Sequence, residues 1–238
     1  MASRATGLTP ADLAKMAPWF GAEVHPRRPA PKDRVGLVLN ADAVRLCVPG
    51  LPPLTWHPGT AYLRLRDGDG PLPRVMGLRP GETVLDATLG LGHDTLVLAH
   101  AQAHVLGLDT VAPLLFFTLD GIRRFAPTLS RRVTVRRAEH GRWLREAPSR
   151  SVDHIYLDPM FPPALGSQSH TLSVLRALAT GRRPTASILR DACRVARRNV
   201  VMKLAPSEPP LWVPGLPKPR VEGSKRVHFG VWRCGGDD

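Results

Sequence analysis

Two short segments contain the residue types from which a chemical site could be built. The first is Asp158-Pro159-Met160-Phe161, which follows an apolar stretch, residues 152–157, typical of a buried strand. The second is the glycine-rich run at residues 86–92, Asp-Ala-Thr-Leu-Gly-Leu-Gly, which ends an earlier apolar stretch. In an open parallel sheet, loops at the carboxyl ends of the strands line a common crevice. We therefore expect the two segments to share one cleft.

The groups of the first segment suit chemistry on a planar amine, such as the exocyclic amine of a nucleobase. The Asp158 carboxylate can accept a hydrogen bond from the amine, and so can the carbonyl of Pro159, whose ring restricts the backbone. Together they would aim the nitrogen lone pair at an electrophile by positioning and electrostatics, without a metal. Phe161 could stack on the base. The alternative is a proline-rich turn capped by Asp158, and the glycine-rich run favours the catalytic interpretation over it.

The glycine-rich run predicts a ligand-binding turn between a strand and a helix. Gly90 and Gly92 allow a tight turn and a close approach to a ligand, and the next helix would offer unpaired N–H groups. A dinucleotide site would have a third glycine where Thr95 stands. Asp86 suits a cationic ligand end, such as the aminoacyl part of S-adenosylmethionine, and Asp109 could accept hydrogen bonds from ribose hydroxyls. The competing interpretation is a tight structural turn.

The composition limits the class of protein. The 238 residues are 43% hydrophobic with a formal charge of +13, which fits one large α/β domain and favours a polyanionic partner. Drift in a GC-rich genome would also give such an arginine-rich composition.

The cysteines, Cys47, Cys193 and Cys234, are far apart and form no CxxC pair. This spacing indicates neither a disulfide framework nor a zinc cluster, and it favours a cytoplasmic location. No run approaches the about 18 apolar residues of a membrane span.

Hydrophobic periodicity predicts the elements that must position the two segments. From about residue 80 the pattern alternates between strand and helix, which predicts a doubly wound, mostly parallel α/β sheet. The expected strands are residues 83–87, 104–108, 133–135, 152–157, 199–204 and 226–232. The expected helices are residues 93–101, 111–125 and 185–198. Residues 219–232 would form an antiparallel hairpin at one edge of the sheet.

The N-terminal part is expected to be a small β-containing extension. A helix should begin near Pro10, and strands are expected at residues 35–39, 43–48 and 61–65. We therefore divide the chain into an extension at residues 1–75 and a catalytic domain at residues 76–238.

These residues resemble a known family. The chain is similar to the class I S-adenosylmethionine-dependent methyltransferases, and among them to the bacterial 16S rRNA guanine-N2 methyltransferases. The resemblance covers about residues 35–232, and its main motifs are Val-Leu-Asp-Ala-Thr-Leu-Gly-Leu-Gly-His-Asp at 84–94 and Tyr-Leu-Asp-Pro-Met-Phe-Pro at 156–162. It implies a Rossmann-like fold with a seven-stranded sheet, S-adenosylmethionine as cofactor and RNA as partner, with neither a membrane nor a metal involved.

The motifs and the resemblance together give the expected site residues. The catalytic set is Asp158, Pro159 and Phe161. The cofactor set is Asp86, Gly90, Gly92, His93, Asp94, Asp109, Thr110, Glu139, His140 and Asp158. The substrate set is Arg64, Arg182, Arg183 and Lys203. The chain departs from the family at His93, Glu139 and His140, and in residues 163–170, which lack the family's lysines.

The expected function is methylation of the exocyclic N2 amine of a guanine in small-subunit ribosomal RNA. One alternative is the same chemistry on another RNA, on DNA or on a protein amide nitrogen, and the altered residues 163–170 motivate it. Another alternative is a non-catalytic RNA-binding assembly factor on a methyltransferase scaffold. The departures at His93, Glu139 and His140 motivate that one.

Overall fold

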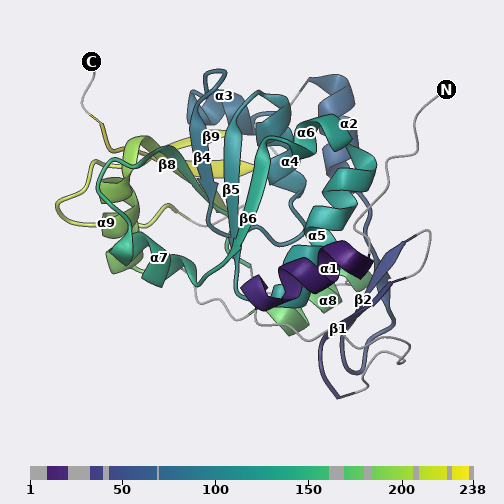
Figure 1. Cartoon of the computed structure of the whole chain (residues 1–238). Coiled ribbons are helices and arrows are strands. Elements are labelled where there is room, and N and C mark those ends of the chain that lie inside the picture. The colour runs from purple at the N-terminus through teal and green to yellow at the C-terminus, as the bar shows by residue number, and fades with distance from the viewer. Residues whose placement is uncertain are drawn as a thin grey trace.

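In the computed structural model, the chain forms two β-sheets with helices packed around them (Figure 1). The described residues are 10–20, 33–39, 43–68, 70–160, 169–179, 184–205, 209–223 and 227–235. Within them, no helix is long and apolar enough to cross a membrane.

The larger sheet has seven strands and confirms the predicted fold class. Its strands are β4 (Thr83–Asp86), β5 (His104–Asp109), β6 (Val133–Arg137), β7 (Val152–Leu157), β8 (Ala196–Leu204), β9 (Arg220–Gly223) and β10 (His228–Arg233). Their order across the sheet is β6-β5-β4-β7-β8-β10-β9. The five strands from β6 to β8 are parallel, whereas β10 is antiparallel to both β8 and β9. The antiparallel hairpin lies at the predicted edge.

Helices cover both faces of this sheet, because successive residues of a strand point to opposite faces. One face packs against α3 (Leu72–Met76), α4 (His93–His100) and α5 (Ala112–Phe125), and the other against α7 (His140–Glu146) and α9 (Ala186–Val195). On β8, Val201 lies in the first of these cores and Val200 in the second. Figure 1 shows α7 and α9 together on one side of the sheet, and α4 and α5 on the other.

The N-terminal extension packs against the α/β body of the larger sheet through apolar side chains. It contains α1 (Pro10–Met16), a 3-10 turn (Ala17–Phe20), β1 (Gly36–Leu39), β2 (Val44–Cys47) and β3 (Leu54–Thr55). Leu46 of β2 shares a core with Phe117 of α5 and Val174 of α8 (His170–Leu178). The indole N–H of Trp56 donates a hydrogen bond to the Leu91 carbonyl, 3.0 Å away, which joins the extension to the glycine-rich segment. The boundary between residues 75 and 76 stays a prediction.

Two predicted elements differ from the structure. Residues 61–65, predicted as a strand, belong to helix α2 (Thr60–Asp67). Alanine, leucine and arginine are good helix formers, and the helix buries Ala61 while it exposes Tyr62 and Leu63. The helix predicted at 185–198 ends at Val195, because β8 begins at Ala196, which pairs with Val152 at the start of β7.

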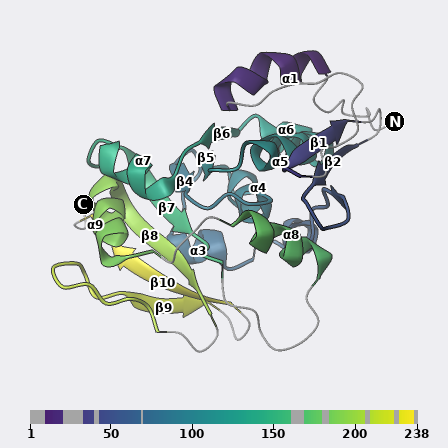
Figure 2. The ribbon, with the colours of Figure 1, turned by 90° about the horizontal axis from the view of Figure 1, so that it is seen from below.

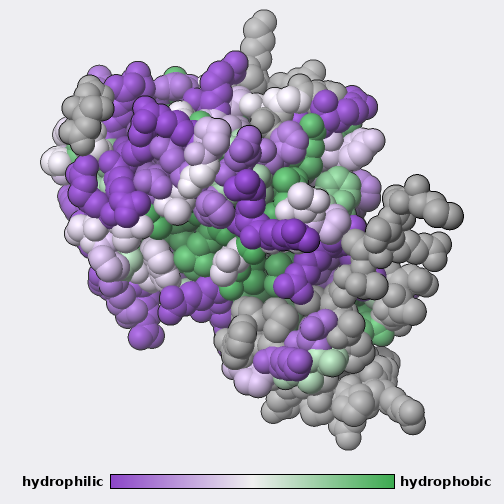
Figure 3. All heavy atoms as spheres, turned by 45° about the horizontal axis from the view of Figure 1, so that its top comes forward, coloured by the Kyte–Doolittle hydropathy of each residue, from purple (hydrophilic) through white to green (hydrophobic). Residues whose placement is uncertain are grey.

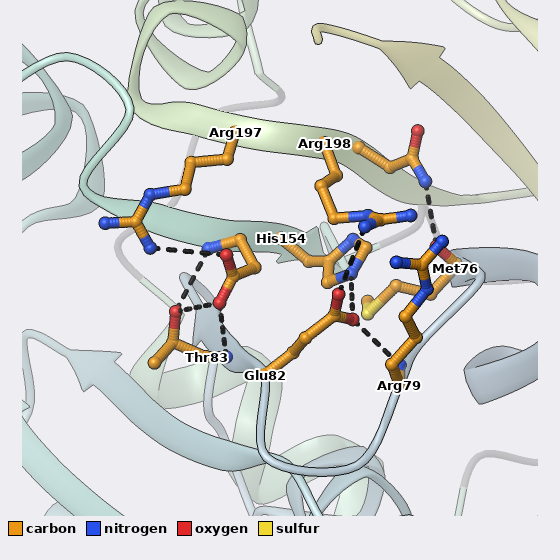
Figure 4. Close-up of polar contacts among 9 residues, drawn as sticks. Met76, Arg79, Glu82, Thr83, His154, Arg197 and Arg198 are labelled. Carbon is orange, nitrogen blue, oxygen red and sulfur yellow. Dashed lines mark hydrogen bonds and ion pairs between the residues drawn. The ribbon is translucent and has the colours of Figure 1, made fainter. Parts of the chain in front are cut away.

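Polar clusters fix the amino-terminal edge of the sheet, opposite the predicted site (Figure 4). The Nε2 atom of buried His154 lies 2.9 Å from Glu82, whose second oxygen lies 3.4 Å from Arg198. Asp153 is paired with Arg197 at 3.2 Å. These pairs join the loop before β4 to β7 and β8, so they hold together the strands whose other ends form the site.

In the view of Figure 3 hydrophilic side chains cover most of the face, and hydrophobic ones gather near its centre. The exposed large apolar side chains include Trp212, which is 64% exposed, and Val221 of the edge strand β9.

Among the described residues, no group of three or more histidine, cysteine, aspartate or glutamate side chains is placed to hold a metal ion.

Candidate active site

An open cleft lies at the carboxyl ends of β4, β5 and β7, and residues of α8 contribute to its lining. In Figure 2, which views the molecule from below, α8 is the green helix in the lower half of the picture. The empty volume of the cleft, including its open mouth, is about 760 Å³. The lining residues are Ala87, Thr88, Gly90, Leu108, Asp109, Thr110, Leu114, Ala138, His140, Asp158, Pro159, Met160, Leu175, Leu178, Ala179 and Pro184. The cleft therefore brings together the two segments singled out in the sequence.

Asp158 lies on the wall of the cleft, directly after β7. Its backbone N–H donates to the Thr88 hydroxyl at 2.7 Å, so the two predicted segments are bonded to each other. Burial raises the pKa of Asp158 to about 6, with the charge of Lys203 opposing the rise and that of Asp94 adding to it. Pro159 lines the cleft beside it. Phe161 lies outside the described residues.

A chain of ion pairs lies behind Asp158. The Lys203 ammonium is 2.8 Å from Asp158 and 3.5 Å from Asp94. Asp94 also accepts hydrogen bonds from the Arg64 guanidinium and, at 2.7 Å, from the Tyr156 hydroxyl. Burial alone would raise the pKa of Asp94, but the charges of Lys203 and Arg64 lower it to about 2. Asp94 is therefore an ionised carboxylate held from three sides.

In this arrangement, three of the predicted site residues are bonded to other residues of the protein. Asp94, expected to contact the cofactor, is bonded to Arg64, Tyr156 and Lys203 and does not line the cleft. Arg64 and Lys203, expected to contact the substrate, direct their charged groups to carboxylates of the same cluster. Arg182 and Arg183 lie outside the described residues.

Asp86 ends β4 and is 2% exposed. Its carboxylate accepts hydrogen bonds from the Thr95 hydroxyl at 2.6 Å and from the Thr88 N–H at 3.1 Å. Thr95, where a dinucleotide loop would have glycine, thus anchors this acid to α4. Burial raises the pKa of Asp86 to about 7, and the carboxylates of Asp94 and Asp158 add to the rise. Asp86 does not line the cleft, so its contact with the cofactor stays a prediction.

The two predicted glycines have left-handed backbone conformations, with φ of 50° at Gly90 and 68° at Gly92. Gly90 lines the cleft, and its carbonyl accepts a hydrogen bond from Thr118 at 2.7 Å. A Cβ atom at Gly92 would lie 2.9 Å from both Ile122 and Thr118 of α5. Gly92 therefore permits helix packing, whereas Gly90 leaves the wall of the cleft open.

The far wall of the cleft is formed after β5 and β6. Asp109 lines it, and the Val111 N–H donates to its carboxylate at 2.9 Å. Burial raises the pKa of Asp109. Thr110 and His140 line the same wall. The Nε2 atom of His140 is buried and has no hydrogen-bond partner in the part of the chain that is described, so it can still bond a ligand.

Glu139 and His93, both expected to contact the cofactor, do not line the cleft. The Glu139 carboxylate caps α7 by accepting from the backbone N–H groups of Gly141 and Arg142, at 2.8 and 2.6 Å. His93 lies 2.8 Å from the His57 carbonyl and contributes to a separate small hollow beside Trp56. Direct cofactor contacts by these two residues stay predictions.

Helix α8 supplies part of the site that the sequence interpretation missed. Leu175 and Leu178 line the cleft from this helix. The sequence contains the pattern of a capped amphipathic helix here, because Ser169 precedes leucines at 172, 175 and 178. In the structure the Ser169 hydroxyl caps the helix by accepting a hydrogen bond from the Leu172 N–H at 3.3 Å. This spacing predicts a helix with an apolar face.

The residues of the cleft fit an adenosine-bearing ligand. Leu108, Leu114 and Ala138 offer an apolar surface, which suits a purine ring. The unpartnered Nε2 atom of His140 could hydrogen-bond a purine, and the Asp109 carboxylate, which lines the cleft, could accept hydrogen bonds from ribose hydroxyls. The wall at Gly90 is free of close atoms, the nearest to a built Cβ being 3.9 Å away.

Comparison with known proteins agrees with this geometry. A family model described as "Putative SAM-dependent methyltransferase" matches residues 55–232. A ribosomal RNA small subunit methyltransferase J from Halorhodospira halophila is 32% identical, over 98% of this chain and 93% of that protein. Protein YpiP of Bacillus subtilis is 30% identical, but the match spans only 62% of its length and 62% of this chain.

A solved structure shows the same fold. A SAM-dependent methyltransferase from Neisseria gonorrhoeae matches with a TM-score of 0.63 and 21% identity, over 89% of this chain and 87% of that one. The family match covers both segments that line the cleft and all of the seven-stranded sheet except its last residue, Arg233. The chain therefore belongs to the SAM-dependent methyltransferase family, whose cofactor is S-adenosylmethionine.

Proposed function

We propose that the protein methylates the exocyclic N2 amine of a guanine in small-subunit ribosomal RNA. The observation that carries the proposal is the cleft that Asp158 and Pro159 line together with Gly90 and Asp109. The substrate class is supported by relatives called ribosomal RNA small subunit methyltransferase J, at 32% identity in Halorhodospira halophila and 30% in Alteromonas mediterranea.

The wall formed after β5 and β6 would hold the cofactor. Asp109 would accept hydrogen bonds from the ribose, and His140 would bond the purine between the apolar side chains of Leu108 and Ala138. When bound, S-adenosylmethionine supplies an electrophilic methyl group. Asp86 would act indirectly, because its hydrogen bonds with Thr88 and Thr95 fix the loop that admits the cofactor.

Asp158 and Pro159 would present the amine. The carboxylate and the Pro159 carbonyl would accept the two N–H groups, and the nitrogen lone pair would then point along the cleft. After this nitrogen has received the methyl group that the cofactor would supply, it would have to release one proton. Asp158, with its pKa raised to about 6, can accept that proton near neutral pH. Phe161 would stack on the base.

An RNA partner agrees with the charge of the chain. The formal net charge of +13 favours association with phosphates. Arg182 and Arg183 follow α8 in the sequence and stay our candidates for phosphate contacts. Action on ribosomal RNA would place the protein in the cytoplasm.

The test is transfer of labelled methyl from S-adenosylmethionine to RNA from a strain that lacks the gene. The wild type should label the RNA, and Asp158→Ala should reduce labelling at least a hundredfold. The matched control is Asp153→Ala, which changes an aspartate at the other end of β7. Equal labelling by the wild type and Asp158→Ala would overturn the assignment of Asp158.

Two further measurements separate the alternatives. Label that survives both RNase and DNase would show a protein substrate instead of RNA. Calorimetry with S-adenosylmethionine tests the scaffold alternative, because a non-catalytic assembly factor need not bind the cofactor. Saturable binding together with labelled RNA would support the proposal, and the absence of both would favour the scaffold.

A further inference from the structure

The Lys203 ammonium lies between two carboxylates at the end of β8. It is 2.8 Å from Oδ2 of Asp158 and 3.5 Å from Oδ2 of Asp94. The side chains of Lys203 and Asp158 are 29% and 28% exposed, so water screens the pair only partly. Lys203 does not line the cleft, whereas Asp158 does. The lysine therefore lies behind the residue proposed to hold the amine.

Asp94 fixes the position of this ammonium. The Tyr156 hydroxyl donates to Asp94 at 2.7 Å, and Arg64 pairs with the other oxygen of the same carboxylate. Tyr156 is 1% exposed and stands on β7 two residues before Asp158. A carboxylate held in this way is a rigid anchor, so Lys203 is attracted to Asp94 on one side and to Asp158 on the other.

We propose that Lys203 is a positioning residue that acts through Asp158. It would engage one carboxylate oxygen and keep the carboxylate ionised, which leaves the second oxygen to accept the hydrogen bond of the substrate amine. The inference rests on the proposed function and deepens it. It also replaces the expectation that Lys203 contacts RNA, because the ammonium is already paired inside the protein.

The charges around Asp158 determine what removal of the lysine should do. The titratable and charged groups that interact with it are Lys203 on β8, Asp94 on α4, Arg64 on α2, Asp86 on β4 and Tyr156 on β7. Burial and Asp94 raise the pKa of Asp158, whereas Lys203 and Arg64 lower it. An opposite charge at this distance lowers the pKa of a carboxyl by about 1–3 units. Without Lys203, Asp158 should therefore be protonated at neutral pH.

The test is the pH profile of methyl transfer between about pH 5.5 and pH 9. In Lys203→Gln, which keeps a hydrogen-bond donor but no charge, the acid limb of kcat/KM should move up by about one unit or more. For a shift of one unit from a pKa of about 6, the rate near pH 6.5 should fall about threefold, with a larger fall for a larger shift, and it should recover near pH 9. Lys203→Arg should stay close to the wild type. Arg197→Met, which removes a basic partner of Asp153 at the other end of the sheet, should leave the profile unchanged.

A readout without turnover separates this inference from the proposed function. The carboxyl carbon signal of Asp158, assigned with Asp158→Asn, can be followed by NMR as the pH changes. The pH at the midpoint of this titration should be higher by about one unit or more in Lys203→Gln than in the wild type. If the wild type binds the cofactor but transfers no methyl, the proposed function fails while this titration still decides the role of Lys203.

Two results would overturn the inference. One is an Asp158 midpoint that is the same in the wild type and in Lys203→Gln. The other is a Lys203→Gln variant that raises KM for RNA at every pH, with kcat unchanged and a weaker dependence of binding on salt. That second pattern would show that Lys203 contacts a phosphate.

Discussion

Replacing Asp86 with asparagine should stabilise the protein, and the gain should grow as the pH rises. Asp86 is 2% exposed, and its hydrogen bonds come from the neutral groups of Thr88 and Thr95. Burial, increased by the charges of Asp94 and Asp158, raises its pKa from 3.8 to about 7. The folded protein therefore binds this proton more tightly than the unfolded chain does.

The sign and the size of the effect follow from that difference. The stability contributed by the protonated carboxyl is complete below about pH 4 and is lost as the pH rises to about 7. A pKa raised from 3.8 to about 7 corresponds to about 4 kcal/mol, at about 1.36 kcal/mol per unit. Asparagine has no charge to bury, and the Thr95 hydroxyl can accept a bond from its amide. The advantage of the variant should therefore increase by about 2–3 kcal/mol between about pH 5 and pH 8.

The assay is urea unfolding of the wild type and Asp86→Asn at these two pH values. Asp153→Asn is the control with the opposite sign. Burial would raise the pKa of Asp153, but hydrogen bonds from Thr83 and the charge of Arg197 lower it, so this variant should lose stability at pH 8. The reasoning would be refuted if Asp86→Asn and the wild type had parallel stability–pH curves.

Three other predictions follow from named contacts. Gly92→Ala should lower the free energy of urea unfolding by about 2–4 kcal/mol, because backbone strain and overpacking add. Gly81→Ala is the control: with φ of 86° and no atom within 4 Å of an added Cβ, it should show the effect of backbone strain alone. Asp109→Ala should weaken S-adenosylmethionine binding at least tenfold in calorimetry, and unchanged affinity would remove Asp109 from the cofactor site. Glu82→Ala should cost about 1–3 kcal/mol, because buried His154 loses its partner, and an unchanged melting temperature would contradict that role.

The sheet and the two facing segments could be predicted because each depends on local pattern. Apolar runs bounded by glycine or proline mark β4 and β7, and the carboxyl ends of parallel strands share one edge. Asp158 and Gly90 therefore met in the cleft as expected. Helix α2 was predicted wrongly because five alternating residues fit a short strand as well as a helix that buries one face.

Side-chain direction was harder to predict, because it depends on contacts distant in the sequence. His93 follows a left-handed glycine and reaches the His57 carbonyl, a contact between residues 36 apart. The Lys203 ammonium meets Asp158 only because β8 lies beside β7 in a particular register. Spacing along the chain contains no signal for either contact.

The central claim is most directly tested by nucleoside mass spectrometry of small-subunit RNA from a strain that lacks the gene. The RNA is incubated with S-adenosylmethionine and either the wild-type protein or Asp158→Ala, and is then digested to nucleosides. We predict that N2-methylguanosine appears with the wild type and is absent with the variant. Methyl groups on a different nucleoside, or equal N2-methylguanosine with both proteins, would contradict the account.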